Sequence, residues 1–358
     1  MKKRWLGFCF MVIPFQASAQ MPPMFFGGPP GFAQFQAITL QRHQARTLLY
    51  RDAIEELKKN PQVADIPVCA PNVRPRAGEC LLPAITPAAP VSASPITVSP
   101  PGIVAKIPAA ESSAVPTEPT LMVRRLALLI GNNNYPSPIP PLDTPVADVT
   151  QIGKLLETRY GYRNQVLKNA GKEAIIAAMN QLAQEARKED SVLVLYAGHG
   201  YQMDDSRMGY WIPVDGSVKS AKGWISNDDI ARLLAAIPAR QIILVSDSCF
   251  SGTLAKEKKL QQSGRIEPEK ILHRRSVMVM TSGDEEPVSD EGKEGHSIFA
   301  WNLLRSLETA RALMPGYEVW QSVHQGVTKD YPQIPQYGAV MSAGHVDGGE
   351  YLFHAETR

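Results

Sequence analysis

Residues Arg240–Gly252 read R-Q-I-I-L-V-S-D-S-C-F-S-G, an apolar run that breaks abruptly into small and polar residues. A short apolar run rich in β-branched residues is typical of a strand buried on both faces of an α/β sheet. Open α/β folds place their chemistry at the carboxyl edge of the sheet, so Cys249 is expected at that edge. A second run of the same kind, Ser191–Ala197, leads into His199, with room between the two for one crossover unit.

Strands and helices alternate from Arg125 onward, which predicts a largely parallel central sheet flanked by helices. The expected strands are 126–130, 165–167, 191–197, 242–245, 276–280 and 349–353, with a β excursion at 209–215. The expected helices are 148–159, 172–188, 226–237 and 297–311. We place this main α/β domain at 121–358.

The first 19 residues have the pattern of a secretory signal peptide. Basic residues precede an apolar segment, Trp5–Phe15, and Ala17-Ser18-Ala19 supplies small residues at a cleavage site. The alternative, an uncleaved membrane anchor, is disfavoured because a spanning helix needs about 20 apolar residues. The sequence therefore predicts export, to the periplasm or to the extracellular space.

Export bears on the state of the cysteines, because cysteines that lie close together form disulfides in an oxidising compartment. Loss of Cys9 with the signal peptide leaves Cys69, Cys80 and Cys249. Cys69 and Cys80 flank a short segment that contains proline and glycine, and they could close a disulfide loop. Cys249 is then either an intermolecular partner or a reactive thiol, and its position at a strand end favours the reactive thiol.

Between the signal peptide and the main domain, the segment 20–81 carries a helical pattern at 32–60 that Asn60-Pro61 ends. This helix is expected to pack either on the main domain or on a partner. Residues 82–120 are rich in proline and alanine, which predicts an extended linker. A net charge of +2 and the absence of a legible binding module argue against a nucleic-acid partner.

A thiol becomes a useful nucleophile when a neighbouring imidazole accepts its proton. His199 is the natural base because it follows a buried strand and stands between two glycines. His296 and His345 also stand beside glycine, so geometry must decide among the three. A histidine at a strand end can also be purely structural. The backbone N–H groups of Gly200 and Cys249 are candidates for an oxyanion site.

The motifs Tyr196-Ala197-Gly198-His199-Gly200 and Asp247-Ser248-Cys249-Phe250-Ser251-Gly252 resemble the caspase-like cysteine peptidases, especially their bacterial metacaspase-like branch. The likeness continues in segments 128–132, 210–215 and 295–299. The resemblance implies the caspase–haemoglobinase fold and endopeptidase activity on peptide or protein substrates. It also implies a His199–Cys249 dyad, with no cofactor required.

Metacaspase-like enzymes cut after Arg or Lys, and Asp148 and Asp247 match acidic positions of their substrate pocket. A pair of carboxylates would bind a guanidinium and exclude an acidic side chain. Alternatively, Asp247 holds its turn and Asp148 caps its helix. After the next strand, Ser282 and Gly283 are expected to border the groove and contact substrate through the backbone.

The resemblance also raises calcium as an activator. Asp215, Asp228 and Asp229 match the ligand pattern of calcium-activated metacaspases, and hard oxygen ligands suit the ion. Lys256 falls near the next expected ligand and would oppose binding. The alternative for Asp228 and Asp229 is that they are first-turn acids favoured by the helix dipole.

The basic segment 256–275 follows the cysteine strand, where caspase-like enzymes often cleave themselves. An enzyme that prefers basic residues would find sites at Lys258, Lys259, Arg274 and Arg275. Two competing functions remain open at this point. One is a catalytically silent caspase-like binding module, and the other is a cysteine-dependent acyltransferase with the same dyad.

Overall fold

The computed structural model describes residues 41, 44–45, 47–60, 66, 68, 124–248, 252–255, 258–259, 268–283, 292–310, 313–331 and 333–356. The predicted signal peptide 1–19, the linker 82–120 and the cysteines Cys69, Cys80 and Cys249 lie outside these residues, as does much of segment 256–275. The predictions made on them stay predictions.

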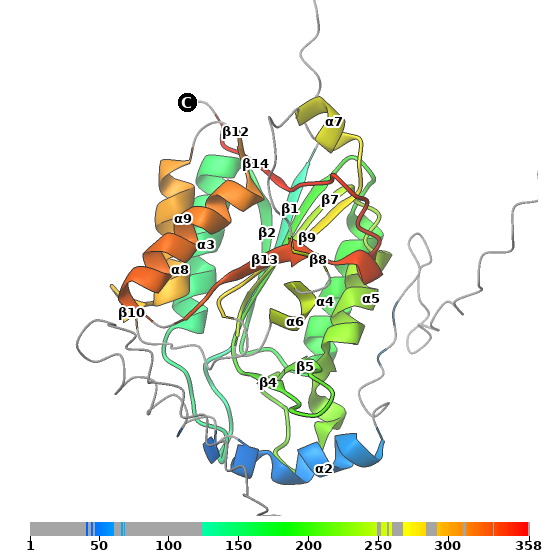
Figure 1. The fold of residues 1–358 in the computed structure, drawn as a ribbon, viewed down its shortest axis with the longest axis vertical. Coiled ribbons are helices and arrows are strands. Elements are labelled where there is room, and N and C mark those ends of the chain that lie inside the picture. Colours follow the sequence, from blue (N-terminus) through cyan, green and yellow to red (C-terminus); the bar gives the residue numbers. More distant parts are fainter. Residues whose placement is uncertain are drawn as a thin grey trace, which may run out of the picture.

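The centre of the fold is a seven-stranded sheet in the order β2-β1-β3-β7-β9-β13-β8 (Figure 1). Its strands are β1 (Arg125–Gly131), β2 (Arg163–Lys168), β3 (Ser191–Ala197), β7 (Gln241–Asp247), β8 (Lys258–Lys259), β9 (Ser276–Thr281) and β13 (Gln336–Ala339). The run from β2 to β9 is parallel, and β13 and β8 each join antiparallel to their neighbour. The predicted largely parallel sheet is confirmed.

Helices cover both faces of this sheet (Figure 1). One face carries α4 (Lys172–Glu185) and α5 (Asn227–Ala236), and the other carries α3 (Pro145–Tyr160), α8 (Ile298–Thr309) and α9 (Gly316–Asp330). The short helix α6 (Gly252–Ala255) lies over β9 and β13.

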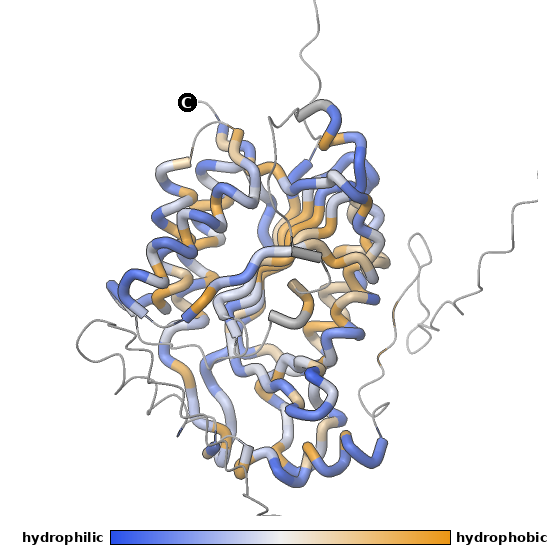
Figure 2. The backbone as a smooth tube through the Cα atoms, in the orientation of Figure 1, coloured by the Kyte–Doolittle hydropathy of each residue, from blue (hydrophilic) through white to orange (hydrophobic). Residues whose placement is uncertain are grey.

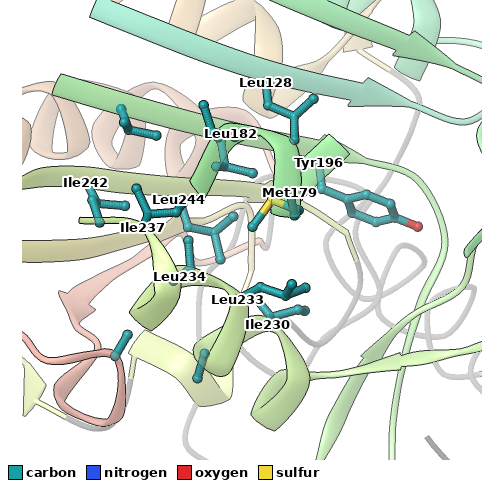
Figure 3. Close-up of a cluster of buried hydrophobic side chains, with 14 of the residues drawn as sticks. Leu128, Met179, Leu182, Tyr196, Ile230, Leu233, Leu234, Ile237, Ile242 and Leu244 are labelled. Atoms are coloured by element: carbon teal, nitrogen blue, oxygen red, sulfur yellow. The ribbon is translucent and has the colours of Figure 1, made fainter. Parts of the chain in front are cut away.

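Successive residues of the central strands point to opposite faces, so a strand covered on both sides is apolar throughout. Leu128 and Ile130 of β1 pack against α4 and α5, whereas Leu129 packs toward α3 and α8. Figure 2 shows the central strands as the most hydrophobic part of the chain. Figure 3 shows Leu128, Met179 and Leu244 converging in one cluster, where truncation of a leucine to alanine costs about 2–5 kcal/mol.

A small second sheet lies beyond the carboxyl edge of the first. It is formed by β4 (Gly200–Gln202), β5 (Gly209–Trp211) and β6 (Ile225–Ser226), and it replaces the single β excursion expected at 209–215. β4 begins at Gly200, directly after His199, and leads the chain away from the end of β3. Residues 200–226 therefore form a separate small sheet at the carboxyl edge of the central sheet.

The N-terminal helix packs on this small sheet of the main domain, one of the two places expected for it, and its binding to a partner stays a prediction. Residues 41, 44–45 and 47–49 are helical, and α2 (Arg51–Lys59) follows and ends at Asn60 as predicted. Tyr50 meets the Trp224 ring edge to face, with ring centroids 5.3 Å apart. The Glu56 carboxylate accepts a hydrogen bond from the Ala221 N–H at 2.9 Å. Figure 1 shows α2 beneath β4 and β5.

Several elements differ from the sequence predictions. The expected strand at 349–353 is β14 (Leu352–His354), and it pairs with β12 (Leu313–Pro315) outside the central sheet. Helix α9 and strand β13 were not predicted. The remaining elements are α7 (Pro268–Leu272), η2 (Ala221–Gly223), η3 (Met341–Ala343) and a hairpin of β10 (Gly292–Lys293) and β11 (His296–Ser297). Within the described part of the chain, no helix has the length and apolarity needed to cross a bilayer.

Candidate active site

The strands that lead to His199 and toward Cys249 are direct neighbours in the sheet. Ala197, the last residue of β3, is the register partner of Asp247, the last residue of β7. The Gly198 N–H donates to the Asp247 carbonyl at 3.2 Å, so the pairing continues past the strand ends. His199 therefore emerges beside the turn that β7 enters, although Cys249 itself lies outside the described residues.

The imidazole of His199 is buried and held by a backbone carbonyl. Its Nε2 lies 2.7 Å from the Pro140 oxygen. A carbonyl oxygen can only accept a hydrogen bond, so Nε2 carries the hydrogen in this contact. In the neutral ring Nδ1 is then the nitrogen that can take up a proton. Because Pro140 acts through its backbone, its side-chain identity gave no sequence signal for this role.

Two tyrosine hydroxyls hold the backbone of His199. The Tyr135 hydroxyl accepts from the His199 N–H at 2.9 Å and donates to the Ile212 carbonyl at 3.0 Å. The Tyr196 hydroxyl lies 2.9 Å from the His199 carbonyl oxygen, to which it donates. A Cβ on Gly198 would lie 2.8 Å from one hydroxyl and 2.9 Å from the other, so only glycine lets both tyrosines approach.

Asparagines at the carboxyl edge hold the loop that presents Pro140. The Asn169 side-chain oxygen accepts from the N–H groups of Asn133 and Asn134, at 2.8 and 2.9 Å. The Asn133 side-chain oxygen in turn accepts from Val146 N–H at 2.8 Å, in the first turn of α3. The segment that reads as an asparagine-rich turn in the sequence thus fixes the partner of the His199 ring.

Polar contacts also fix the end of β7. The Ser246 hydroxyl lies 3.2 Å from the Trp211 indole nitrogen, which donates to it, and 3.0 Å from the Ser248 hydroxyl. The Trp211 ring stacks on Tyr196, with centroids 4.3 Å apart and planes 11° apart. The ends of β3 and β7 are therefore tied to each other and to the small sheet.

The two predicted pocket carboxylates lie on one side of this edge, joined by two consecutive residues of β11. Asp148 Oδ1 accepts from His296 Nδ1 at 2.7 Å. Ser297 Oγ donates to Asp247 Oδ2 at 2.6 Å, and its backbone N–H lies 3.4 Å from Asp148 Oδ2. Burial raises the pKa of Asp148, and its hydrogen bond from His296 opposes that rise. The sequence predicted both carboxylates but not the bridge between them.

Gly200, Ser282 and Gly283 are the residues expected to contact substrate through their backbone groups. Gly200 begins β4 directly after His199, opposite Trp211. The backbone of Ser282, which was expected to meet substrate, is used inside the protein: its N–H donates to Ser246 O and its carbonyl accepts from Gln333 at 2.6 Å. Gly283 is buried, and its carbonyl accepts from the Thr281 hydroxyl at 2.8 Å. The N–H and carbonyl of Ser282 and the carbonyl of Gly283 therefore already have hydrogen-bond partners inside the protein.

Geometry separates the three histidines that stand beside glycine. His345 accepts from the Val277 N–H at 3.1 Å, near the amino end of β9 and so at the opposite edge of the sheet. His296 belongs to the carboxylate bridge through Asp148. His199 is the one that follows the strand adjacent to β7.

The acids suggested as calcium ligands are occupied in helix ends. Asp215 Oδ1 accepts from the Lys172 N–H at the start of α4. Asp229 forms a capping box with Ser226 and an ion pair with Arg232, and Asp228 shares its first helical turn. Among the residues that the structure describes, no three His, Cys, Asp or Glu side chains are placed to hold a metal ion. Asp228 and Asp229 lie in the first turn of α5, where the alternative reading expects them, and calcium binding stays a prediction.

The chain is similar in sequence to known proteins over its main domain. The caspase domain of peptidase family C14 matches residues 124–345, inside the predicted main domain. Metacaspase-1B of Aspergillus oryzae is 31% identical over 150 residues, 36% of this chain and 35% of that protein. Metacaspase-7 of Arabidopsis thaliana is 33% identical over 154 residues, 38% of this chain and 36% of that protein. The matched part thus spans about a third of the length of these relatives.

The chain also resembles two solved structures at low sequence identity. Caspase-1 from Spodoptera frugiperda is 17% identical with a TM-score of 0.46, covering 64% of this chain and 94% of that one. A protein from Geobacter sulfurreducens is 16% identical with a TM-score of 0.45, covering 61% and 93%. The family match covers most of the chain and includes both β3 and β7. The chain belongs to the caspase-domain family, peptidase family C14.

Proposed function

We propose that this chain is a cysteine endopeptidase in which His199 and Cys249 form the catalytic dyad. One observation carries the proposal: His199 Nε2 is bonded to the Pro140 carbonyl, beside the strand that leads to Cys249. That bond orients the ring and assigns its hydrogen to Nε2, so Nδ1 is the base.

The dyad would work by nucleophilic catalysis. His199 Nδ1 takes the proton of the Cys249 thiol, and the sulfur attacks the carbonyl carbon of the scissile peptide. The resulting imidazolium gives its proton to the leaving amine as the C–N bond breaks, which leaves a thioester. Water, deprotonated by His199, then hydrolyses the thioester and restores the thiol.

The tetrahedral intermediate carries a negative oxygen that needs hydrogen-bond donors. We assign this role to the backbone N–H groups of Gly200 and Cys249. Gly200 follows the base directly and starts a strand that is paired with β5, which makes its backbone rigid. Each such donor is worth roughly 10²–10³ in rate.

The substrate preference we propose is Arg or Lys before the scissile bond. Asp148 and Asp247 support it, because both carboxylates are buried beside the same two residues of β11. Carboxylates in such a pocket would attract a cationic side chain and repel an acidic one. Self-processing within 256–275 would follow from the same preference.

The chain is also proposed to act after export, with its peptide or protein substrate outside the cytoplasm. This part rests on the signal-peptide pattern of residues 1–19. Fusion of residues 1–25 to a reporter that is active only after export would test it. A reporter that stays inactive would contradict it.

The central experiment measures turnover of fluorogenic peptides that end in Arg, Lys or Asp, by wild type and by Cys249→Ala. Turnover of the Arg and Lys peptides by wild type alone supports the proposal. Preference for the Asp peptide would overturn the assigned specificity. No turnover of any peptide would favour the binding module, and transfer to an added amine in preference to water would favour the acyltransferase.

A further inference from the structure

We propose that the N-terminal helical segment 47–59 is part of the support of the proposed active site, with Tyr50 and Leu57 as positioning residues. The segment fixes β4 and, through it, the backbone N–H of Gly200, the proposed oxyanion donor. The proposal rests on the proposed function, because that donor serves the proposed reaction. The segment itself lies outside the caspase domain, which matches residues 124–345. The observations that carry it are the aromatic contacts of Tyr50, the edge position of β4 and the direction of the Gly200 N–H.

An aromatic cluster anchors segment 47–59 on the small sheet. Tyr50 meets the Tyr201 ring edge to face, with ring centroids 5.6 Å apart, and the Tyr201 centroid lies 5.8 Å from that of Trp224. Tyr50 also contacts Trp224, so the three rings close a triangle in which each residue is at most 1% exposed. Leu57 is buried in the same cluster. Because Tyr201 makes these contacts through its ring, they survive the loss of its hydroxyl.

Two polar contacts fix the position of the segment along the sheet. The Ala53 N–H donates to the Val218 carbonyl at 3.3 Å, and Glu56 accepts the hydrogen bond from the Ala221 N–H. Val218 and Ala221 lie in the connection between β5 and β6. The segment therefore binds β4 through the Tyr201 ring and the rest of the small sheet through this connection.

The geometry of β4 leaves the Gly200 N–H directed away from its partner strand. β4 has three residues and lies at the edge of the small sheet, next to β5. The Ile212 N–H donates to the His199 carbonyl at 3.0 Å, and Tyr201 is the register partner of Tyr210. Bonded and non-bonded pairs alternate in an antiparallel ladder, so the bonds to β5 form at His199 and Tyr201. The Gly200 N–H between them points to the other side, as a donor to substrate must.

The two neighbours of Gly200 hold its backbone, because a glycine has no side chain of its own to pack. His199 on one side is held by two tyrosine hydroxyls. Tyr201 on the other side is buried against Tyr50. Loss of the helical segment would free one end of the glycine and let the donor move, while the histidine keeps its own partners.

The test replaces one of two leucines of the same segment with glutamate in the full chain. Leu57 is 3% exposed and Leu48 is 72% exposed. A charge at position 57 must leave the cluster to reach water, whereas a charge at position 48 is already in water. Steady-state kinetics on a peptide that the wild type cleaves give kcat and KM. Hydrogen exchange in segment 47–59 and in the central strands shows whether the sheet stays folded.

Alkylation with iodoacetamide separates the oxyanion donor from the dyad. The reaction forms a bond between carbon and the Cys249 sulfur and releases iodide. No negative oxygen develops, so the rate does not depend on an oxyanion donor. It depends on the thiolate, which His199 promotes. Mass spectrometry of the peptide that contains Cys249 measures this rate in each variant.

Leu57→Glu should lower kcat by about 10- to 100-fold, because complete loss of an oxyanion donor costs roughly 10²–10³. Its KM and its alkylation rate should stay close to the wild-type values. Leu48→Glu should match the wild type, and Leu57→Met should recover most of kcat because it keeps the buried volume. If Leu57→Glu does not fold, Leu57→Ala takes its place with a smaller fall in kcat.

A kcat of Leu57→Glu at or above the wild-type value overturns the proposal. An alkylation rate that falls along with kcat overturns it as well, because the segment would then act on the dyad or on the whole fold. Equal effects of the two leucine changes would show that added charge, and not lost packing, is the cause. In each of these cases a wild type that cleaves peptides keeps its proposed function. A wild type that cleaves no peptide loses both the function and this inference.

Discussion

Ala197 and Asp247 are register partners at the ends of adjacent parallel strands, and the Gly198 N–H binds the Asp247 carbonyl beyond them. His199 and Cys249 each follow two residues after a member of this pair. Neighbouring strands lie about 4.8 Å apart, so the sheet itself brings the two chain segments together. The buried core therefore fixes the end of β7 beside Gly198, the residue that precedes His199.

Replacing Tyr135 with phenylalanine should slow catalysis with little effect on substrate binding. The variant keeps the ring that meets the His199 imidazole at 4.6 Å and loses the hydroxyl that binds the His199 N–H. Loss of a buried hydrogen bond is worth about 1 kcal/mol or more, so kcat should fall about tenfold with KM nearly unchanged. Steady-state kinetics on an Arg peptide measure both constants.

Tyr201→Phe is the matched control for this variant. Tyr201 lies in the same apolar cluster, but its hydroxyl faces Thr47 of the N-terminal helix. The control should lose stability and keep kcat. If Tyr135→Phe lowers only the melting temperature, Tyr135 is a core residue without a positioning role.

Self-processing should occur at Lys258 or Lys259 in preference to Arg275. The guanidinium of Arg275 donates to the Ile237 and Ala239 carbonyls at the end of α5, at 2.8 and 2.6 Å. These bonds must break before Arg275 can enter a substrate pocket, whereas Lys258 and Lys259 form a two-residue edge strand. Intact-mass and peptide mass spectrometry of purified protein locate the cut.

The double variant Lys258→Gln/Lys259→Gln should remain uncut at this position, and Cys249→Ala should remain intact throughout. Wild-type protein that cleaves an Arg peptide and stays whole would contradict self-processing. A cut after Arg275 would instead require that the end of α5 opens under the reaction conditions.

Chelation of divalent metals should leave turnover unchanged. Asp215 binds a helix N–H and Asp229 binds a capping serine and an arginine, and no three acidic, histidine or cysteine side chains among the described residues are grouped to hold a metal. Assays with EDTA, with added calcium and with added magnesium should give one kcat/KM value. A large rise with calcium alone would show that the ion binds elsewhere, and calorimetric titration of Cys249→Ala would then give its stoichiometry.

The strands that build the active edge were predictable because burial on both faces leaves an unbroken apolar run. β1, β3, β7 and β9 all have this form, and each was found with its bounds within about two residues. β13 has the sequence Q-Y-G-A and gains its place from pairing with β9. No local pattern distinguishes such a segment from a loop.

Helix α9 was missed for a related reason. Its buried aliphatic residues form the narrow stripe of Val319, Val323 and Val327, and most of the positions between them are polar. The helix starts at Pro315-Gly316, a pair that usually indicates a turn. Contact with α8 stabilises it, and that contact is invisible in a local reading.

Some residues of the candidate site could be predicted from the sequence, and others could not. His199, Asp148 and Asp247 were found because each side chain follows or begins an element with a clear pattern. The Pro140 carbonyl was missed because any residue supplies a carbonyl, and the bond between Asp148 and His296 joins distant parts of the chain. The one available signal was Ser297, which caps α8 and so places His296 at the sheet edge.

Stability should fall as the pH rises toward neutrality because of Glu350. Burial raises the pKa of this carboxyl from 4.5 to about 7, while the Tyr337 hydroxyl and the Tyr351 N–H bind it and oppose the rise. Between these values the unfolded chain releases the proton and the folded chain keeps it. The stabilisation is therefore complete below about pH 4.5 and is lost as the pH rises through about 7.

Glu350→Gln should remove this part of the pH dependence, because glutamine keeps the neutral form of the side chain. Urea unfolding of the Cys249→Ala protein at several pH values between about 5 and 8 measures it, with a difference of about 1–3 kcal/mol expected across the window. Exposed Glu308→Gln is the control and should follow the parent. A parent whose unfolding free energy rises through this window would contradict the sign, and would mean that the carboxyl ionises in the folded protein at least as easily as in the unfolded chain.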